Sequence, residues 1–498
     1  ALLTAYVDQG DGEKALQLYL QMGAEGVEMF GELTLVLALQ ACILLAGEGG
    51  GLLNISYIVG QALHADVCKH GLTTSVLIST SLLTMYAKCG DIVELEHFFS
   101  GMSYCNVASW NAMLSAYIEK GDEWKALQLF VQMQEQSVKP NRRTYVLALQ
   151  ACVKLAEKEK SLHTEGRSMC LPILEIGQAL HLDLEKNQFA SDAFVGSTLL
   201  TMYGKCGALT EAENVFASIS ECSTIVWTAM LSVYIEEGQG YKVLQLFEKM
   251  QREHIEPDHV ALLCILKACG TVQASKEGRI IHEMVVKRGY EKDSNIGNTV
   301  VDMYARCGSL DEACKSFHEL QTRNIVSYGA MIAGYAQFGH GFLALDLYDH
   351  MQLNDMEPNK AIFVSIVKAC GVAKTILEGM LVHGQIIDSS FETDVLIGSA
   401  LIDMYSRCGS HEEACKVLYD LPNRDVISWS AVISGYAQDG QGFSALGLFA
   451  RMQKEGIKPD NISILSALKC CANVGAIVEG RLIHKELIRN GAVNDLII

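Results

Sequence analysis

MYAKCG at residues 85–90 decides the fold, because it returns as MYGKCG at 202–207, MYARCG at 303–308 and MYSRCG at 404–409. The last three copies are 101 residues apart. A catalytic motif is normally present once, whereas a motif that returns at a fixed period is typical of a repeat architecture. We interpret each copy as a helix end, in which Met and Tyr face the neighbouring repeat, Lys or Arg meets the negative helix terminus and Gly stops the helix.

Composition excludes several classes of protein. The chain has 498 residues, of which 50% are hydrophobic, so it is not intrinsically disordered. It contains six prolines and few strand-like runs between turn signals, which favours helices. The longest apolar run, residues 33–46, is shorter than the ~20 residues of a membrane span, so we expect no membrane partner. The chain starts at ALLTAYVDQG and stops at NDLII, and we expect truncation at both ends.

Cysteine and histidine follow the repeat. Seventeen cysteines are present without a CxxC pair, and most fall at equivalent places of the period. This placement predicts small buried side chains in a reducing compartment. The periodic histidines are interpreted as packing residues on second helices, and we expect neither a metal nor a cofactor; they are His64, His181, His282, His383 and His484.

Within one period the apolar residues describe helical hairpins. Residues 110–117 place apolar side chains at i, i+3, i+4 and i+7, Gly121 interrupts the pattern, and residues 126–133 repeat it. The period divides into units of 35, 35 and 31 residues, for example 224–258, 259–293 and 294–324. One hairpin cannot cover both of its apolar faces, so neighbours must stack into a solenoid.

These features resemble the plant pentatricopeptide repeat family, in its subclass that cycles P, L and S motifs. The resemblance rests on the 35/35/31 triplet with SWNAMLSAY, KACG, GxxxH and MYxKCG, and covers nearly the whole chain. It implies an all-α fold, a right-handed superhelical α-solenoid of about 14 stacked helix-turn-helix motifs, as one array over residues 1–498. P motifs are placed at 107, 224, 325 and 426, L motifs at 142, 259, 360 and 461, and S motifs at 76, 193, 294 and 395.

The resemblance also divides the chain into triplets. Residues 1–75 hold a partial P and L motif, 76–223 an S-P-L-S series, 224–324 and 325–425 one P-L-S triplet each, and 426–498 a P-L pair with the start of an S motif at Leu496. Two L motifs carry insertions, around GEGGGLLNISY at 47–57 and EKEKSLHTEGRSMC at 157–170. We expect both to be surface loops, the second near 156–176.

The function that the resemblance implies is sequence-specific binding of single-stranded RNA, one base per repeat, in mitochondria or chloroplasts. In this family such binding often specifies sites of cytidine-to-uridine editing, with editing-complex proteins or a separate deaminase as partners. Stacked hairpins of fixed rise can present one side chain per unit to an extended strand with unpaired base edges. The residues implied are the fifth and the last of each motif, with the second residue packing against the bases.

Six of the eight complete P and S motifs fit the family's pairing pattern. The implied adenine reader is Thr80/Asn106, the pyrimidine readers are Asn111/Asn141 and Asn298/Asn324, and the guanine readers are Thr228/Asp258, Ser399/Asp425 and Ser430/Asp460. Two pairs do not fit, Ser197/Ser223 and Gly329/Asn359. At the second position, Ile225, Val326 and Ile427 suit packing on base faces.

The L motifs differ at the fifth position, where they carry Val146, Leu263, Val364 and Leu465. An aliphatic group cannot exchange a hydrogen bond with a base. We expect the L motifs to space the readers.

The formal charge of −19 opposes RNA binding, because nucleic-acid proteins usually carry basic patches. A Lys or Arg precedes Cys in every MYxKCG copy, however, and acids such as Glu211, Asp311 and Glu412 begin second helices. We expect the acidity to lie mostly off the RNA groove, and binding to depend more on bases than on phosphates.

Catalysis is not expected of this chain. His484 and Glu486 form an HxE, half of a zinc deaminase signature, but no PCxxC follows. No Walker loop, GxSxG or HExxH is present. Two alternatives to an editing factor stay open: an RNA-binding factor for splicing, stability or translation, and a helical-repeat scaffold for protein interactions, in which changes at fifth positions would leave RNA affinity unchanged.

Overall fold

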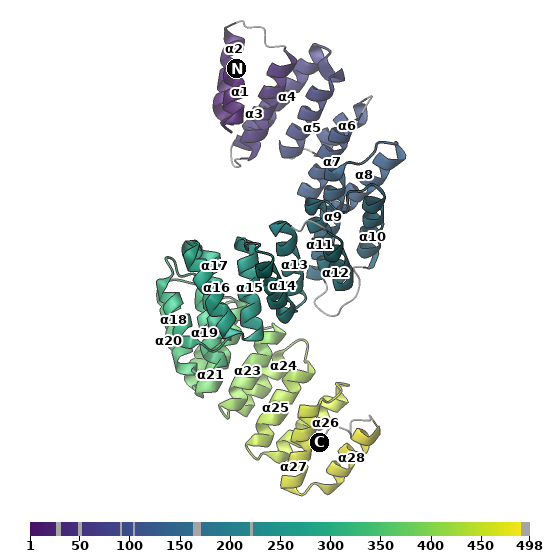
Figure 1. The fold of residues 1–498 in the computed structure, drawn as a ribbon. Helices are drawn as coiled ribbons and strands as arrows, with labels where there is room; N and C mark the ends of the chain where they lie inside the picture. The colour runs from purple at the N-terminus through teal and green to yellow at the C-terminus, as the bar shows by residue number, and fades with distance from the viewer. Residues whose placement is uncertain are drawn as a thin grey trace. The chain divides into compact units, whose positions relative to one another are not determined.

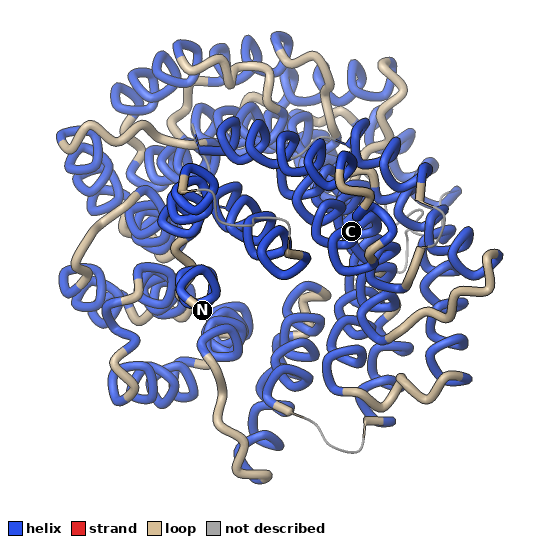
Figure 2. The backbone as a smooth tube through the Cα atoms, turned by 90° about the horizontal axis from the view of Figure 1, so that it is seen from above, coloured by secondary structure: helices blue, strands red, loops and turns tan. Residues whose placement is uncertain are grey.

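The computed structural model describes residues 1–25, 31–47, 52–89, 92–102, 105–162, 171–219 and 223–489. Over these ranges the regular elements are 28 α-helices and two short 3-10 helices, at Leu72–Thr74 and Tyr290–Lys292. Figure 2 shows helices and loops alone in the described chain. The prediction of an all-α chain is confirmed. The S motif predicted to start at Leu496 lies outside the described residues.

The helices pair into hairpins, two per motif, in agreement with about 14 motifs. The first helices are α1 (Leu2–Asp8), α3 (Glu32–Gly47), α5 (Val76–Cys89), α7 (Val107–Lys120), α9 (Arg142–Leu162), α11 (Ala193–Lys205), α13 (Thr224–Glu236), α15 (His259–Val272), α17 (Ser294–Arg306), α19 (Ile325–Gln337), α21 (Lys360–Ala373), α23 (Val395–Arg407), α25 (Val426–Gln438) and α27 (Asn461–Val474). The second helices are α2 (Gly12–Ala24), α4 (Leu52–Lys69), α6 (Ile92–Gly101), α8 (Glu123–Glu135), α10 (Leu171–Lys186), α12 (Leu209–Ser218), α14 (Gly240–Arg252), α16 (Ser275–Lys287), α18 (Leu310–Glu319), α20 (Gly341–Leu353), α22 (Ile376–Asp388), α24 (His411–Asp420), α26 (Gly442–Lys454) and α28 (Ile477–Arg489). A helix begins at each of the twelve predicted motif starts, although the division into P, L and S classes stays a prediction.

Two compact units make up the chain (Figure 1). One holds Ala1–Gln239 with Glu248–Ala261, and the other holds Gly240–Phe247 with Leu262–Ile498. In the first unit each first helix packs on the next, from α1 to α13, and in the second unit the same holds from α17 to α27. Second helices such as α8, α20 and α26 contact the first helix of the following hairpin. First helices therefore form a continuous layer in each unit.

The MYxKCG copies are the places where hairpins interlock. A Cβ at Gly379 would lie 2.6 Å from Sδ of Met404, so the glycine of GxxxH makes room for the methionine. The tyrosine of each copy hydrogen-bonds Nδ1 of a periodic histidine at 2.7–3.1 Å, in the pairs His64–Tyr86, His181–Tyr203, His282–Tyr304 and His383–Tyr405. Burial lowers the pKa of all four histidines, in keeping with a neutral imidazole that accepts a hydrogen bond from the tyrosine hydroxyl. The predicted packing role of these four histidines is confirmed, whereas the fifth, His484 in α28, is exposed.

The periodic cysteines lie beside these contacts. Cys42, Cys152, Cys269 and Cys370 are buried, and burial raises the pKa of each thiol to about 12. The cysteines of the described residues are free thiols. The prediction of small buried side chains is confirmed for Cys42, Cys152, Cys269 and Cys370. The periodic cysteines that precede Gly are only partly buried; they are Cys89, Cys206, Cys307 and Cys408.

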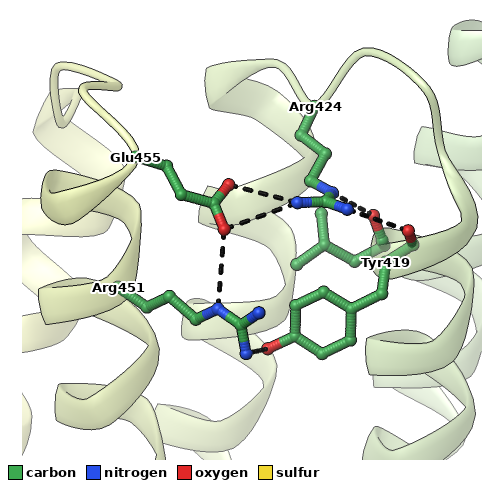
Figure 3. A network of polar contacts seen from close by, with 5 residues as sticks. Tyr419, Arg424, Arg451 and Glu455 are labelled. Atoms are coloured by element: carbon green, nitrogen blue, oxygen red, sulfur yellow. Dashed lines mark hydrogen bonds and ion pairs between the residues drawn. The ribbon is translucent and has the colours of Figure 1, made fainter.

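Successive S and P motifs join through aromatic packing on the second-helix side. The ring pairs Phe99–Trp110, Phe216–Trp227 and Phe317–Tyr328 repeat one edge-to-face geometry, with centroids 5.0–5.1 Å apart and planes at 82°. In the last joint, the Arg424 guanidinium holds Glu455 at 3.3 Å, and Arg451 Nη1 donates to the Tyr419 hydroxyl at 3.1 Å (Figure 3). Arg424 also donates to the carbonyl of Tyr419 at 2.9 Å, which ends α24 with a charged hydrogen bond.

The insertions of the two L motifs correct a prediction. We predicted surface loops, but residues 52–57 belong to α4, and α9 continues to Leu162. Helix α10 begins at Leu171, so the loop predicted near 156–176 is helical at its two ends, over residues 156–162 and 171–176. The Ala, Glu and Lys residues that end α9 have high helix propensity, which favours extension of the helix. Residues 48–51 and 163–170 lie outside the described residues.

Candidate nucleic-acid interface

The last residue of a motif is the N-cap of the next first helix. Asn106, Asn141, Asp258, Asn324 and Asp460 each accept, through Oδ1, the backbone N–H three residues further on, at 2.8–3.1 Å. Asp425 does the same toward Ser428 at 2.8 Å. Asn and Asp are preferred at this position because the first helical N–H groups lack carbonyl partners. The residue type at this position therefore has a structural cause as well as a predicted role in base reading.

Four of the six predicted reading pairs lie in direct hydrogen-bond contact. The fifth residue donates to Oδ1 of the last residue in each, at 3.3 Å for Asn111–Asn141, 3.0 Å for Thr228–Asp258, 3.2 Å for Asn298–Asn324 and 2.8 Å for Ser430–Asp460. The four fifth residues are buried, whereas Asn141 is exposed and the other three last residues are partly exposed. Each last residue is therefore oriented by its cap and by its partner, with one edge toward solvent.

Two predicted pairs are not in direct contact. The hydroxyls of Ser399 and Ser428 lie 2.9 Å apart, and Ser428 donates to Oδ1 of Asp425 at 2.6 Å, so this pair is bridged. The Thr80 hydroxyl lies 2.9 Å from the carbonyl of Val76, inside its own helix, and makes no hydrogen bond to Asn106 among the described residues.

The sequence interpretation missed a third polar residue, three positions after the N-cap. It is a buried Ser or Thr in five motifs: Ser109, Thr144, Ser327, Ser428 and Ser463. The Thr144 hydroxyl lies 2.8 Å from Oδ1 of Asn111 and 3.0 Å from Oδ1 of Asn141, and so joins both members of a pair. Ser327 instead donates to the carbonyl of Asn324, and Oδ1 of Asn298 is buried without a hydrogen-bond partner in the described part of the chain. The pattern [ND]-x-x-[ST] at the motif boundaries could have revealed these residues.

Burial and hydrogen bonding act in opposite directions on the Asp460 carboxyl. Burial favours its neutral form, but the hydrogen bonds from Ser463 and Ser430 outweigh burial and lower its pKa. This group is therefore ionised at neutral pH and acts only as an acceptor.

A groove of about 630 Å³ joins several predicted reading residues of the first unit. Its lining includes Thr80, Asn111 and Asn141, with Ala108 from the second position of the P motif. It is formed by the first helices α3, α5 and α7, together with the N-terminus of α9. The continuous layer of first helices therefore carries the open surface beside the predicted reading residues.

The second-position residues lie exposed on the same helices. Ile225, Val326 and Ile427 are 55%, 57% and 66% exposed, which leaves them free to pack against a ligand. The sequence interpretation overlooked further exposed apolar residues in this register, which are Leu77, Phe194, Val260, Leu396 and Ile462. Their position in the motif was the available signal.

Ion pairs hold the basic residues of the MYxKCG copies. Lys88 pairs with Glu119 at 2.8 Å, and Arg306 pairs with Asp302 one turn earlier, also at 2.8 Å. The acids predicted to begin second helices do so, at Glu211 in α12, Asp311 in α18 and Glu412 in α24. Among the described helices, none is long and apolar enough to cross a membrane.

Comparison with known proteins agrees with this architecture. The PPR repeat family model matches residues 105–154 and 424–473, and the PPR repeat model matches residues 1–27, 225–255, 298–325, 326–356 and 399–426. A chloroplastic pentatricopeptide repeat-containing protein of Arabidopsis thaliana is 31% identical over 474 residues, which cover 95% of this chain and 73% of that protein. The chain belongs to the pentatricopeptide repeat family.

Other pentatricopeptide repeat proteins extend the comparison. A mitochondrial one from Arabidopsis thaliana is 30% identical over 505 residues, with 97% of this chain and 53% of that protein covered. The chain thus spans between about half and three quarters of the length of these two relatives. The crystal structure of the pentatricopeptide repeat protein PPR10 from maize has the same fold, with a TM-score of 0.54 at 17% identity, over 98% of this chain and 78% of that one.

Proposed function

We propose that this pentatricopeptide repeat tract binds single-stranded RNA along its first helices, and that the fifth and last residues of its P and S motifs select one base each. The observation that carries the proposal is the set of four direct pairs from Asn111–Asn141 to Ser430–Asp460. A residue that is held from two sides can present its remaining polar atom in a fixed direction, which base selection requires.

The chemistry of each pair suits the base assigned to it. In Thr228–Asp258 and Ser430–Asp460, Oδ1 of the aspartate accepts two hydrogen bonds, one from the backbone N–H that it caps and one from the hydroxyl of its partner. Oδ2 has no hydrogen-bond partner among the described residues. A free carboxylate oxygen accepts hydrogen bonds, and guanine offers N–H donors on its pairing edge. In Asn141 and Asn324 the free atom is the amide Nδ2, a donor that suits the carbonyl acceptors of a pyrimidine.

The proposal extends to the biological role. The tract specifies the site of cytidine-to-uridine editing of an organellar transcript, in the mitochondrion or the chloroplast, the two compartments that appear in the names of its relatives. Editing-complex proteins or a separate deaminase would then complete the reaction. Excess tract added to an organellar extract should compete for the transcript and lower its editing, and unchanged editing at saturating tract would contradict this role.

Selection of bound RNAs from a randomised single-stranded pool tests base reading. In motif order from 76 to 460, the six assigned pairs predict A-Y-N-N-G-N-Y-N-N-G-G, in which Y is a pyrimidine and N an unassigned position. We expect enrichment of this pattern in one polarity. Enrichment of nothing, or of an unrelated sequence, would contradict the proposal.

A further inference from the structure

Three lysines occupy one place in successive L motifs. Lys267, Lys368 and Lys469 are each the ninth residue of the motif and lie 101 residues apart. All three are exposed. The ninth residue lies four positions after the fifth, so it occupies the same helix face one turn further along. The lysines therefore follow the aliphatic residues that cannot read a base.

Ninth residues face the groove where its lining is defined. In the first unit the groove of about 630 Å³ is lined by Gln40, Thr84 and Ser115, which are the ninth residues of α3, α5 and α7. Thr80 and Asn111 line the same groove. Since the hairpins are equivalent, the ninth residues of the second unit lie on the corresponding face of its first helices.

These lysines are the unpaired cations of that face. On the first helices of the second unit, Arg306, Lys360 and Arg407 each form an ion pair, with Asp302, Asp394 and Asp403 respectively. Lys267, Lys368 and Lys469 form none with any residue that the structure describes. A solvated ammonium group without a partner keeps its charge available for an external anion, and the anions that run along an extended RNA strand are its phosphates.

We propose that Lys267, Lys368 and Lys469 bind RNA backbone phosphates, so that the L motifs of the second unit anchor the strand between reading motifs. The inference rests on the proposed function and adds a role to motifs that were expected only to space the readers. The first unit lacks this device, because its L motifs carry Gln40 and Gln150 at the ninth position. Its Lys88 and Lys205 are paired with Glu119 and Glu236 at 2.8 and 2.7 Å.

The salt dependence of RNA binding tests the proposal. The test variant carries Lys267→Gln, Lys368→Gln and Lys469→Gln, which reproduces the residue of the first unit. The control carries Lys287→Gln, Lys315→Gln and Lys454→Gln, three exposed lysines on second helices, and so changes the net charge equally. Affinity for a fluorescent single-stranded RNA from the randomised pool is measured between 50 and 200 mM salt, with circular dichroism to check folding.

Each phosphate contact to a single strand contributes about 0.7 to the slope of log affinity against log salt. Three lost contacts should lower the slope by about 2, so wild type should lose roughly 20-fold more affinity than the test variant over this range. The control should keep the wild-type slope. If wild type binds RNA and the two variants behave alike, the phosphate inference fails alone. If wild type binds no RNA, the proposed function fails with it.

Discussion

The hydroxyl of Thr228 donates to Oδ1 of Asp258 at 3.0 Å, and the same oxygen accepts the backbone N–H of Ala261 at 2.8 Å. One carboxylate oxygen thus starts α15 and fixes the orientation of a predicted reading pair. Capping uses Oδ1 of Asp258, whereas the proposed reading uses Oδ2, so the two roles are separable. Variants that keep one role and remove the other follow from this geometry.

Asp258→Asn and Asp258→Ala should separate the two roles. Asn is as good an N-cap as Asp, so Asp258→Asn should leave stability nearly unchanged while the preferred base at this position moves from guanine toward adenine. Asp258→Ala should lower the free energy of unfolding by about 1 kcal/mol through loss of the cap. Urea unfolding and binding to RNAs that differ at this base measure both effects. A loss of stability in Asp258→Asn equal to that in Asp258→Ala would contradict the separation.

Ser428→Ala should affect reading as well as stability. Its hydroxyl joins Ser399 to Asp425, whereas the hydroxyl of the equivalent Ser109 donates to Oδ1 of the N-cap Asn106 without joining it to Thr80. Both alanine variants lose a buried hydrogen bond and should be destabilised by about 1–2 kcal/mol. Only Ser428→Ala should weaken base preference at its own position, measured by pool selection. Equal effects of the two variants on base preference would show that the bridge has no role in reading.

Acidification should destabilise the array through the four half-buried histidines that bond to tyrosines. Burial lowers the pKa of His282, although Glu319, Glu283 and Glu291 oppose the shift. A group whose pKa is lower when folded takes up protons preferentially when unfolded, so stability is complete above about pH 6.5 and falls as pH drops from there through the folded pKa. The loss is at most about 1.4 kcal/mol per pH unit for each histidine.

Urea unfolding at pH 7.5 and 5.5 measures this effect. His282→Gln should show a smaller pH dependence than wild type, with the exposed His97→Gln as the control for loss of one imidazole. The explanation is wrong if wild type is equally stable at both pH values, or if His282→Gln retains the full dependence.

Gly379→Ala and Gly384→Ala form a matched pair within α22. A Cβ at position 379 would meet Met404, whereas one at 384 would have no atom within 4 Å. Both variants gain about 0.5–1 kcal/mol from helix propensity. Gly379→Ala also overpacks the hairpin contact, which costs about 1–3 kcal/mol and should make it the less stable of the two by that amount. Equal thermal midpoints would mean that Met404 moves aside freely.

The helical fold could be predicted because its signals are local. Gly stops such as Gly308, which has φ of +75°, and caps such as Asn324 are written at fixed places of the period. A helix accordingly begins at every predicted motif start. The insertions were mispredicted because helix extension into them depends on propensity, and the period does not record it.

The site was less predictable, because hydroxyl geometry is not written in residue type. Thr80 and Thr228 are both the fifth residue of their motif. The Thr80 hydroxyl nevertheless donates to a carbonyl of its own helix, whereas the Thr228 hydroxyl donates to the last residue of its motif. The Ser428 hydroxyl bridges Ser399 and Asp425 because the Ser399 hydroxyl and Oδ1 of Asp425 both lie within hydrogen-bond distance of it, which residue type alone does not reveal. The Lys88–Glu119 ion pair joins residues from successive repeats and needs their spacing in three dimensions.

The most direct test of base reading is selection from a randomised RNA pool with wild type beside the double variant Thr228→Asn, Asp258→Asn. Asn at both places reproduces the Asn111–Asn141 pair and retains the N-cap of α15. We predict that one position in the enriched RNA changes from guanine to a pyrimidine while all others hold. An unchanged preference, or a loss of preference along the whole sequence, would contradict reading of one base by this pair.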